Sequence, residues 1–286
     1  MDLAAEIERN VALALAEDVG SGDLTALLIP AETSTAAATA GATVISRENV
    51  VLCGTLWFET CFRQLSPKTK IHWLFKDGER VEQNQTLCEI IGNARALLTA
   101  ERPALNFLQT LSAVATQTRR YVDAVAGTGA VIMDTRKTLP GLRLAQKYAV
   151  TCGGGVNHRL GLYDGILIKE NHIIAAGGIE QALRAAGEIA PPGIFIQIEV
   201  ETLEQLRKAL NAGAKMILLD NFDLAQLRYA VSLTRQAGIS HAVLEASGGI
   251  TLENVRAVAE TGVDRISVGN LTKDVKAVDL SMRFSE

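Results

Sequence analysis

A cluster of cationic side chains between residues 134 and 172 is the part of the sequence best suited to chemistry. This window holds six Lys/Arg and two of the four His but only three Asp/Glu, so its formal charge is +3. The whole chain carries −4, so the remainder is acidic. Positive charge concentrated within an acidic protein is typical of a pocket for small, highly charged anions. Nucleic-acid-binding proteins usually have a basic overall balance, so we expect no nucleic-acid partner.

Carboxylates elsewhere in the chain could complete such a pocket. Glu199 and Glu201 alternate along an apolar segment, which puts them on one face of a predicted strand together with Gln197. Asp220 ends the next apolar segment. Carboxylates that converge on one cavity could bind Mg²⁺, contact ribose hydroxyls or pair with the Lys/Arg cluster, and the spacing alone leaves these three roles open.

Two glycine turns follow the last two predicted strands, Ser247-Gly248-Gly249-Ile250 and Ser267-Val268-Gly269-Asn270. Backbone N–H groups at such turns can approach a phosphate, and the last two loops of an α/β barrel often hold one. A single Gly turn is more often only a turn, but the pair predicts a phosphate site. His158 and Arg159 follow another glycine-rich run and are placed to bind an anion.

The four cysteines are widely spaced and form no C-x-x-C pair, which predicts that they pack in the core. Cys152 directly precedes the glycine run of residues 153–155, and a nucleophilic role for it would need a base nearby. The four are Cys53, Cys61, Cys88 and Cys152.

From residue 129 onward the rhythm is strand, loop, helix, which indicates a parallel sheet with right-handed crossovers. Polar residues gather where each strand ends, as in an α/β barrel; an open doubly wound sheet would bind at one switch point. The predicted strands are Ala130–Asp134, Gly165–Lys169, Ile194–Val200, Met216–Asp220, Ala242–Glu245 and Arg265–Val268. The predicted helices are Leu142–Val150, Ile179–Glu188, Leu203–Ala212, Asp223–Ala237 and Leu252–Thr261.

The first part of the chain has a different pattern. An amphipathic helix is expected through Ala16, and residues 36–91 read as short strands separated by turns. Residues 93–125 predict a nearly continuous helix interrupted at Arg102-Pro103, where Pro can open a new first turn. No apolar run approaches the ~20 residues that span a bilayer, and the N-terminus lacks a secretion signal, so we expect a cytoplasmic protein without a membrane partner.

Several long motifs resemble the quinolinate phosphoribosyltransferase family, and the likeness extends over essentially the whole chain. They are Asp134–Arg143, Lys147–Val150, Cys152–Gly155, Asn157–Leu162, Ile168–Ile173, Ile266–Lys273 and Asp279–Phe284. The resemblance implies an N-terminal α/β sandwich domain, residues 1–113 joined by residues 275–286, and an incomplete six- to seven-stranded α/β barrel over residues 114–274. It also implies a homodimer.

The resemblance implies phosphoribosyl transfer from 5-phosphoribosyl 1-diphosphate to quinolinate with decarboxylation, a step of NAD biosynthesis, with Mg²⁺ accompanying the donor. It implies catalytic roles for Lys137, Glu199 and Asp220, the two carboxylates facing ribose and metal. Arg102 resembles the arginine that reaches the partner subunit's pocket. The residues implied to bind substrate are these four together with Thr135, Arg136, His158, Arg159, Lys169, Ser247, Gly248, Gly249, Val268, Gly269 and Asn270.

Three positions depart from the family's pattern. Pro103 stands where Thr is usual, Gln197 replaces an acidic residue, and Asn270 replaces Ala. Three other functions are considered: a molybdenum-transport-associated relative of unclear substrate, nicotinate phosphoribosyltransferase, and a non-catalytic sensor of a phosphorylated sugar. The full-length likeness favours the quinolinate enzyme, because a sensor has no need of Lys137, Glu199 and Asp220 together.

Overall fold

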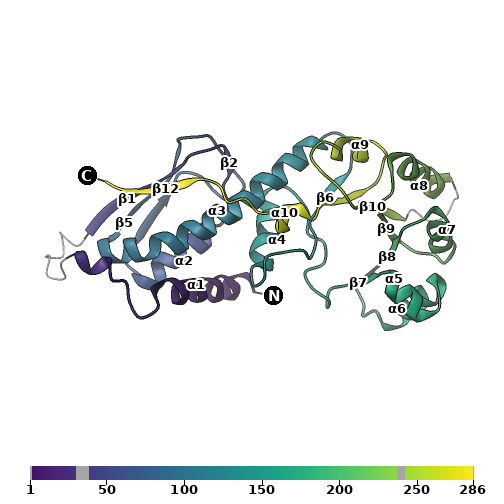
Figure 1. The fold of residues 1–286 in the computed structure, drawn as a ribbon, viewed down its shortest axis with the longest axis horizontal. Coiled ribbons are helices and arrows are strands. Elements are labelled where there is room, and N and C mark those ends of the chain that lie inside the picture. Colours follow the sequence, from purple (N-terminus) through teal and green to yellow (C-terminus); the bar gives the residue numbers. More distant parts are fainter. Residues whose placement is uncertain (1, 30–38, 237–241, 286) are drawn as a thin grey trace. The chain divides into compact units, whose positions relative to one another are not determined.

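The computed structural model describes residues 2–29, 39–236 and 242–285 of the chain (Figure 1). It divides into two compact units. Unit 1 is Met1–Arg119, Thr138–Gly154 and Asp274–Glu286, and unit 2 is Arg120–Lys137 and Gly155–Lys273. Residues 114–119, 138–154 and Asp274 therefore lie in unit 1, whereas the sequence-based division placed all of residues 114–274 in the barrel. Ala145, Ala149 and Val150 belong to the core of that unit, which accounts for the difference.

Unit 1 is built on a four-stranded antiparallel sheet in the order β12-β1-β5-β3, with a separate β2-β4 pair. The last strand of the chain pairs with the first, from Ala42 opposite Phe284 to Ser46 opposite Leu280. The strands are β1 (Thr39–Ser46), β2 (Val50–Val51), β3 (Lys70–Trp73), β4 (Arg80–Val81), β5 (Thr86–Asn93) and β12 (Leu280–Phe284). Short strands were expected between residues 36 and 91, and β1 to β5 begin in that region.

Helices provide the rest of the core of unit 1. They are α1 (Leu3–Val19), the 3-10 turn η1 (Ala26–Leu28), α2 (Thr55–Leu65), α3 (Ala94–Ala124), whose last turn lies in unit 2, and α4 (Arg143–Cys152).

Two expectations for these helices were wrong. Helix α2 lies in a region predicted to contain only strands. Its aromatic residues Trp57, Phe58 and Phe62 favour strands in isolation but are fully buried here, so tertiary packing determines the helix. Helix α3 runs through Pro103 without interruption. Its apolar side chains around that position, including Leu105 and Leu108, are buried, and this packing outweighs one lost backbone hydrogen bond.

Unit 2 is a six-stranded parallel sheet in the order β6-β11-β10-β9-β8-β7. Strands β6 and β7 are consecutive in sequence but lie at opposite edges, and Val156 makes a single parallel bridge to Met133 beside β6. This is the incomplete α/β barrel expected from the sequence. The strands are β6 (Val131–Met133), β7 (Gly165–Ile168), β8 (Phe195–Val200), β9 (Met216–Asp220), β10 (Val243–Ser247) and β11 (Arg265–Ser267).

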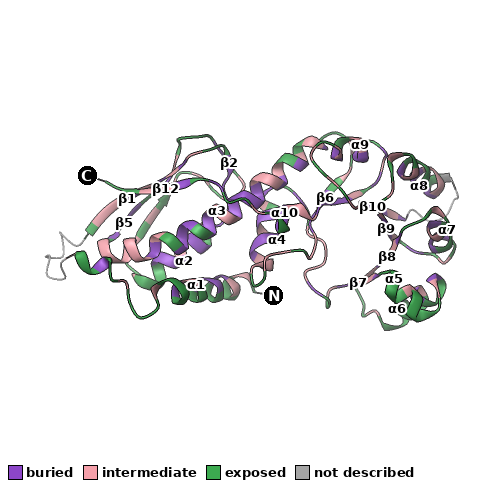
Figure 2. Ribbon diagram, viewed as in Figure 1, coloured by how far each residue is buried: buried purple, intermediate pink, exposed green. Residues whose placement is uncertain are grey.

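Helices pack against this sheet, and the buried core of unit 2 is formed by residues of both the strands and the helices (Figure 2). They are α5 (Glu170–Ala176), α6 (Ile179–Ile189), α7 (Leu203–Asn211), α8 (Leu224–Gln236), α9 (Val255–Ala259) and α10 (Asn270–Lys273). The expected end of α8, Ala237, lies outside the described residues. Helix α5 was not predicted because it buries no residue and so has no apolar face. Within the described ranges, no helix is long and apolar enough to cross a membrane.

Candidate active site

A cavity of about 400 Å³ opens at the carboxyl ends of the strands of unit 2. Side chains at or just beyond the ends of all six strands contribute to it, which is the arrangement that barrel enzymes use. The sequence-predicted residues gathered here are Thr135, Arg136, Lys137, His158, Arg159, Lys169, Glu199, Asp220 and Ser247. The cavity is further lined by Asp134, Leu167, Leu218, Glu245 and Ser267.

The cationic side chains of the cavity are crowded together. Burial and then repulsion from Arg136 lower the pKa of the Arg159 guanidinium, which donates from Nη1 to the Gly165 carbonyl at 3.1 Å. The Nε of Arg136 is buried and meets no hydrogen-bond acceptor among the described residues. An exposed Lys137 lies over Gly269, where an added Cβ would be 3.5 Å from its Cδ. Like charges held this close favour the binding of an anion.

Two carboxylates face these cations. Glu199 on β8 accepts from Lys169 Nζ at 3.0 Å, so part of the predicted pairing with the Lys/Arg cluster is present. Burial first, and then the charge of Glu199, raise the pKa of Asp220 at the end of β9. Lys169, Lys137 and a hydrogen bond of 2.9 Å from Asn221 Nδ2 oppose that rise. The two acids therefore share one electrostatic environment in which a cation would be stabilised.

The glycine turn after β10 lies next to Asn221, the residue that follows Asp220. Asn221 adopts a left-handed backbone conformation with φ 56°, and its side chain lies against Gly248. A Cβ on Gly248 would be 2.1 Å from Asn221 Oδ1, so only glycine fits that position. The glycine turn thus holds the side chain that contacts Asp220.

A buried chain of hydrogen bonds lies beneath the cavity. The backbone N–H of Arg159 donates to His158 Nδ1 at 2.7 Å, which leaves the ring proton on Nε2, 2.7 Å from Gln197 Oε1. Gln197 Nε2 donates to Glu245 Oε2 at 2.9 Å, and Ser267 Oγ donates to the other oxygen of the same carboxylate. Gln197 and Glu245 are fully buried. The chain therefore links the ring of His158 to strands β8, β10 and β11.

The roles of Asp134, Glu245 and Ser267 in this arrangement were missed by sequence reasoning. Asp134 is fully buried and accepts the backbone N–H of His158 at 2.8 Å. The sequence predicted a strand that ends at Glu245, but β10 continues to Ser247. Residues two positions apart on a strand point to the same face, so Glu245 shares a face with Ser247. Because Ser247 was already predicted to bind substrate, this spacing could have identified Glu245.

Some predicted residues take other positions. Val268 is buried in the core of unit 2, and its N–H bonds to the Met133 carbonyl at 2.9 Å. Asn270 Nδ2 donates to the Tyr121 hydroxyl at 2.8 Å. Gly249, with φ 61°, lies in the turn after β10, and Arg102 is exposed on α3 in unit 1.

Comparison with known proteins supplies the family. The chain matches the family models of the N-terminal domain of quinolinate phosphoribosyl transferase over residues 23–112 and of its C-terminal domain over residues 114–283. A Bacillus subtilis protein named probable nicotinate-nucleotide pyrophosphorylase (carboxylating) is 43% identical over 266 residues, which is 93% of this chain and 89% of that protein.

More distant relatives and solved structures agree with this match. A mitochondrial quinolinate phosphoribosyltransferase (decarboxylating) of Nicotiana tabacum is 36% identical over 98% of this chain and 82% of its own length. A solved nicotinate-nucleotide pyrophosphorylase from Francisella tularensis has 42% identity and a TM-score of 0.93, covering 100% of this chain and 98% of its own. The chain belongs to the quinolinate phosphoribosyltransferase family.

Proposed function

We propose that the chain transfers the phosphoribosyl group of 5-phosphoribosyl 1-diphosphate to quinolinate with loss of CO₂, forming nicotinate mononucleotide and diphosphate in NAD biosynthesis. The observation that carries this proposal is the cavity of unit 2, where crowded cations face two carboxylates. Quinolinate is a dianion and the donor carries several more negative charges, so both substrates need such a cluster. The family membership of the chain supports the same reaction.

The arginines and lysines suit different parts of the substrates. The planar fork of Arg136 and of Arg159 matches a carboxylate, and the buried Nε of Arg136, which meets no acceptor in the described parts of the chain, could donate to one. Lys137 and Lys169 offer compact charges suited to phosphate oxygens. We assign the quinolinate carboxylates to the arginines and the donor's phosphates to the lysines.

The first chemical step joins the pyridine nitrogen to the anomeric carbon. The bond from that carbon to diphosphate breaks, its electron pair leaves with diphosphate, and positive charge develops on the ribose. We assign the stabilisation of that charge to Asp220 and to Glu199, which pairs with Lys169. Holding nitrogen and carbon in line in one cavity supplies much of the remaining acceleration.

The second step releases CO₂. Once the ring nitrogen is quaternary and cationic, the ring can accept the electron pair of the bond to the 2-carboxylate, and a proton from solvent then replaces CO₂. Lys137 is the cation we assign to this centre. Its backbone is fixed on both sides, because its N–H donates to Thr135 Oγ1 at 3.0 Å and its carbonyl accepts from Thr272 Oγ1 at 2.8 Å.

We propose that Mg²⁺ accompanies the donor. The donor set fits, because Glu199 and Asp220 offer the carboxylate oxygens that Mg²⁺ prefers, and the raised pKa of Asp220 marks a position where a cation lowers the electrostatic cost. When bound, Mg²⁺ would neutralise charge on the diphosphate. We expect EDTA to abolish turnover and added Mg²⁺ to restore it; full activity in EDTA would contradict the assignment.

We also propose a homodimer in which Arg102 enters the partner subunit's cavity. Its exposed position on α3 supports this role. Arg102→Ala and Lys137→Ala chains should each be inactive alone, but mixed dimers should regain activity because one of their two sites carries neither change. Absence of recovery after mixing would contradict the shared site. The cytoplasmic location expected from the sequence stays a prediction.

A single assay separates the candidate functions. Purified protein is given Mg²⁺, 5-phosphoribosyl 1-diphosphate and either quinolinate or nicotinate, and CO₂ and nicotinate mononucleotide are measured. The proposal expects both products from quinolinate and none from nicotinate. Product from nicotinate alone would move the chain to the sister activity. Absence of product from both would favour the molybdenum-associated relative or a sensor.

A further inference from the structure

Two cysteines and an aspartate form a compact group in unit 1. The candidate active site lies in unit 2. The ligand atoms of Cys53, Asp77 and Cys152 all lie within 4.8 Å of one another. Cys53 lies between β2 and α2, Asp77 lies in the turn before β4, and Cys152 is the last residue of α4. The packing of these three segments therefore brings the two thiols together.

The carboxylate of this group already has a structural role. Asp77 Oδ2 accepts from the Gly54 N–H at 3.2 Å and from the Tyr148 hydroxyl at 2.9 Å, and Oδ1 accepts from the Thr55 N–H at 3.3 Å. These bonds hold the first turn of α2 and the side of α4. Because the carboxylate is used in this way, a metal ion would have to compete for it, and the two thiols are left as the chemically available pair.

The two thiols are unequal. A hydrogen bond from Cys53 is the largest influence on Cys152 and lowers the pKa of its thiol, whereas burial raises the pKa of the Cys53 thiol well above its usual value. Cys152 is half-buried and Cys53 is fully buried. Reactivity toward an oxidant follows thiolate character and exposure, so Cys152 is the sulfur that reacts first.

The backbone at both cysteines packs against α3. Cys53 bonds through its N–H to Ser112 Oγ at 3.0 Å, and its carbonyl accepts from the same hydroxyl at 3.1 Å. Gly153, next to Cys152, packs so closely that a Cβ there would lie 2.5 Å from Thr118 Cβ. Contacts with α3 therefore position both cysteines, and their sulfur atoms lie within 4.8 Å of each other, so a small movement suffices to bring them to bonding distance.

We propose that Cys53 and Cys152 form a dithiol that closes to an intrachain disulfide when the protein meets a hydroperoxide. The Cys152 thiolate attacks the peroxide, the O–O bond breaks, and a protonated oxygen leaves as water or alcohol, which gives a sulfenic acid. The Cys53 sulfur then attacks Cys152, its proton leaves with the hydroxyl as water, and the S–S bond forms. Two thiols are oxidised and one peroxide is reduced.

The other two cysteines provide an internal control. Cys61 and Cys88 are fully buried, and burial raises the pKa of Cys61 to about 12 and that of Cys88 further. They are not in the group and should not react. The inference predicts that the thiol count per chain falls from four to two, and not below.

The test uses the reduced full-length protein and a small excess of hydrogen peroxide. After quenching, free thiols are counted in denaturant, and peptides are mapped by mass spectrometry. We expect a Cys53–Cys152 cross-linked peptide that dithiothreitol removes, and the same result in the Cys61→Ala, Cys88→Ala double variant. In Cys53→Ala, Cys152 should react more slowly because it loses the hydrogen bond from Cys53, and oxidation should stop at a sulfenic acid on Cys152 that dimedone labels.

Two outcomes would overturn the proposal. One is retention of four thiols, or cross-links that involve Cys61, Cys88 or a second chain. The other is one tightly held zinc ion per chain that protects the thiols and is lost in both Cys152→Ala and Asp77→Asn, which would make the group a metal site. Zinc content is measured on the same reduced sample before peroxide is added.

Discussion

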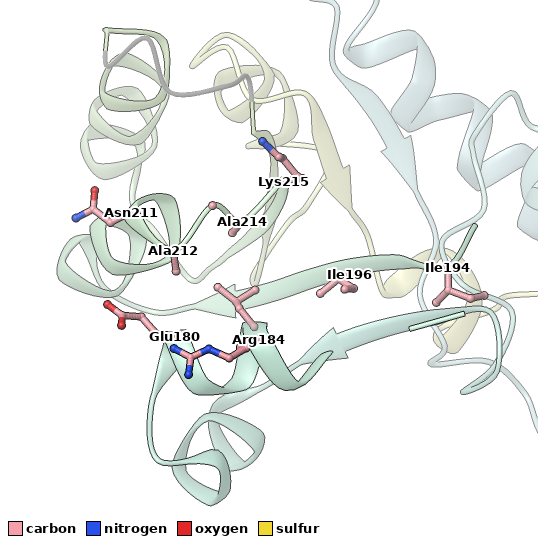
Figure 3. Close-up of a pocket in the computed structure, with 10 residues that line it drawn as sticks. Glu180, Arg184, Ile194, Ile196, Asn211, Ala212, Ala214 and Lys215 are labelled. Atoms are coloured by element: carbon pink, nitrogen blue, oxygen red, sulfur yellow. The ribbon is translucent and has the colours of Figure 1, made fainter. Parts of the chain in front are cut away.

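Two cavities lined by described residues of unit 2 lie at opposite ends of its parallel strands, and the larger of the two is not the candidate active site. The cavity at the amino ends of β8 and β9 has a volume of about 670 Å³ and lies between α6 and α7 (Figure 3). Its charged side chains, Glu180, Arg184 and Lys215, are all exposed. The cavity at the carboxyl ends is about 400 Å³. Volume alone therefore does not identify the functional cavity.

The difference between the two cavities is in how their polar groups are held. At the carboxyl ends, like charges are adjacent, as with Arg136 and Arg159, and a buried chain through Gln197 and Glu245 supports the lining. At the amino ends all three charged side chains are exposed, whereas at the carboxyl ends Arg136 and Arg159 are half-buried and Glu245 is fully buried. Unfavourable charge pairs that persist in a folded protein indicate selection for function rather than for stability.

Among the tests of this comparison, Lys137→Ala should cause the largest loss of kcat. Loss of one charge that acts in the transition state typically costs about 10² to 10³ in kcat. Lys137 is exposed, so we expect the fold to remain intact. Steady-state kinetics and circular dichroism measure the two properties, and unchanged turnover in a folded variant would sink the assignment of this cavity.

A smaller effect is expected from Gln197→Leu. This change removes the donor to one oxygen of the fully buried Glu245 and the acceptor of His158, so the free energy of unfolding should fall by about 1–3 kcal/mol. It should also raise KM, because the His158 ring, which accepts the Arg159 N–H, loses the hydrogen bond to Gln197 that holds it in place. Urea denaturation and kinetics measure these changes. The matched control, Gln181→Leu on the exposed face of α6, should change neither quantity.

A shift in pH dependence is expected from Asn221→Gly. Glycine accepts the left-handed backbone but removes a hydrogen bond that lowers the pKa of Asp220. The pKa should rise further, so the acidic limb of the kcat profile should move to higher pH if ionised Asp220 is required. Stability should also fall as pH rises from the unfolded-state pKa through the folded one, because the folded state favours the protonated carboxyl. An unmoved limb would remove Asp220 from the reaction.

The smallest effect is expected in the larger cavity. Arg184→Ala changes an exposed side chain on α6, so activity should change by less than about twofold. The measurement is kcat/KM with quinolinate. A tenfold loss would mean that the amino ends of the strands contribute to function, and the contrast between the two cavities would fail.

The fold was predictable wherever local pattern determined structure. Strand β9 was predicted at its observed bounds, because an uninterrupted apolar run ends at the charged Asp220. Helix α2 was missed because its sequence is rich in strand-forming aromatic residues, and only burial against the rest of unit 1 decides its conformation. The extent of β10 was also misjudged, which concealed the buried position of Glu245.

The sequence predicted the charged residues of the candidate site but not the buried hydrogen bonds that hold them in position. Arg136, Lys137 and Arg159 stand out by residue type within a short window, and the structure gathers them in one cavity. The hydrogen bonds from His158 to Gln197 and from Gln197 to Glu245 join residues 39 and 48 positions apart. Such pairs depend on the order of strands in the sheet, which hydrophobic pattern does not determine.

The pairing of β12 with β1 has a consequence for the order in which the chain is made. A ribosome that has completed β1, β5 and β3 must still synthesise all of unit 2 before the strand that covers the free edge of β1 emerges. Throughout that interval the edge exposes unpaired backbone groups, which are templates for association with another chain. Nascent chains, or chains cut short before Leu280, are therefore the forms of this protein most exposed to aggregation.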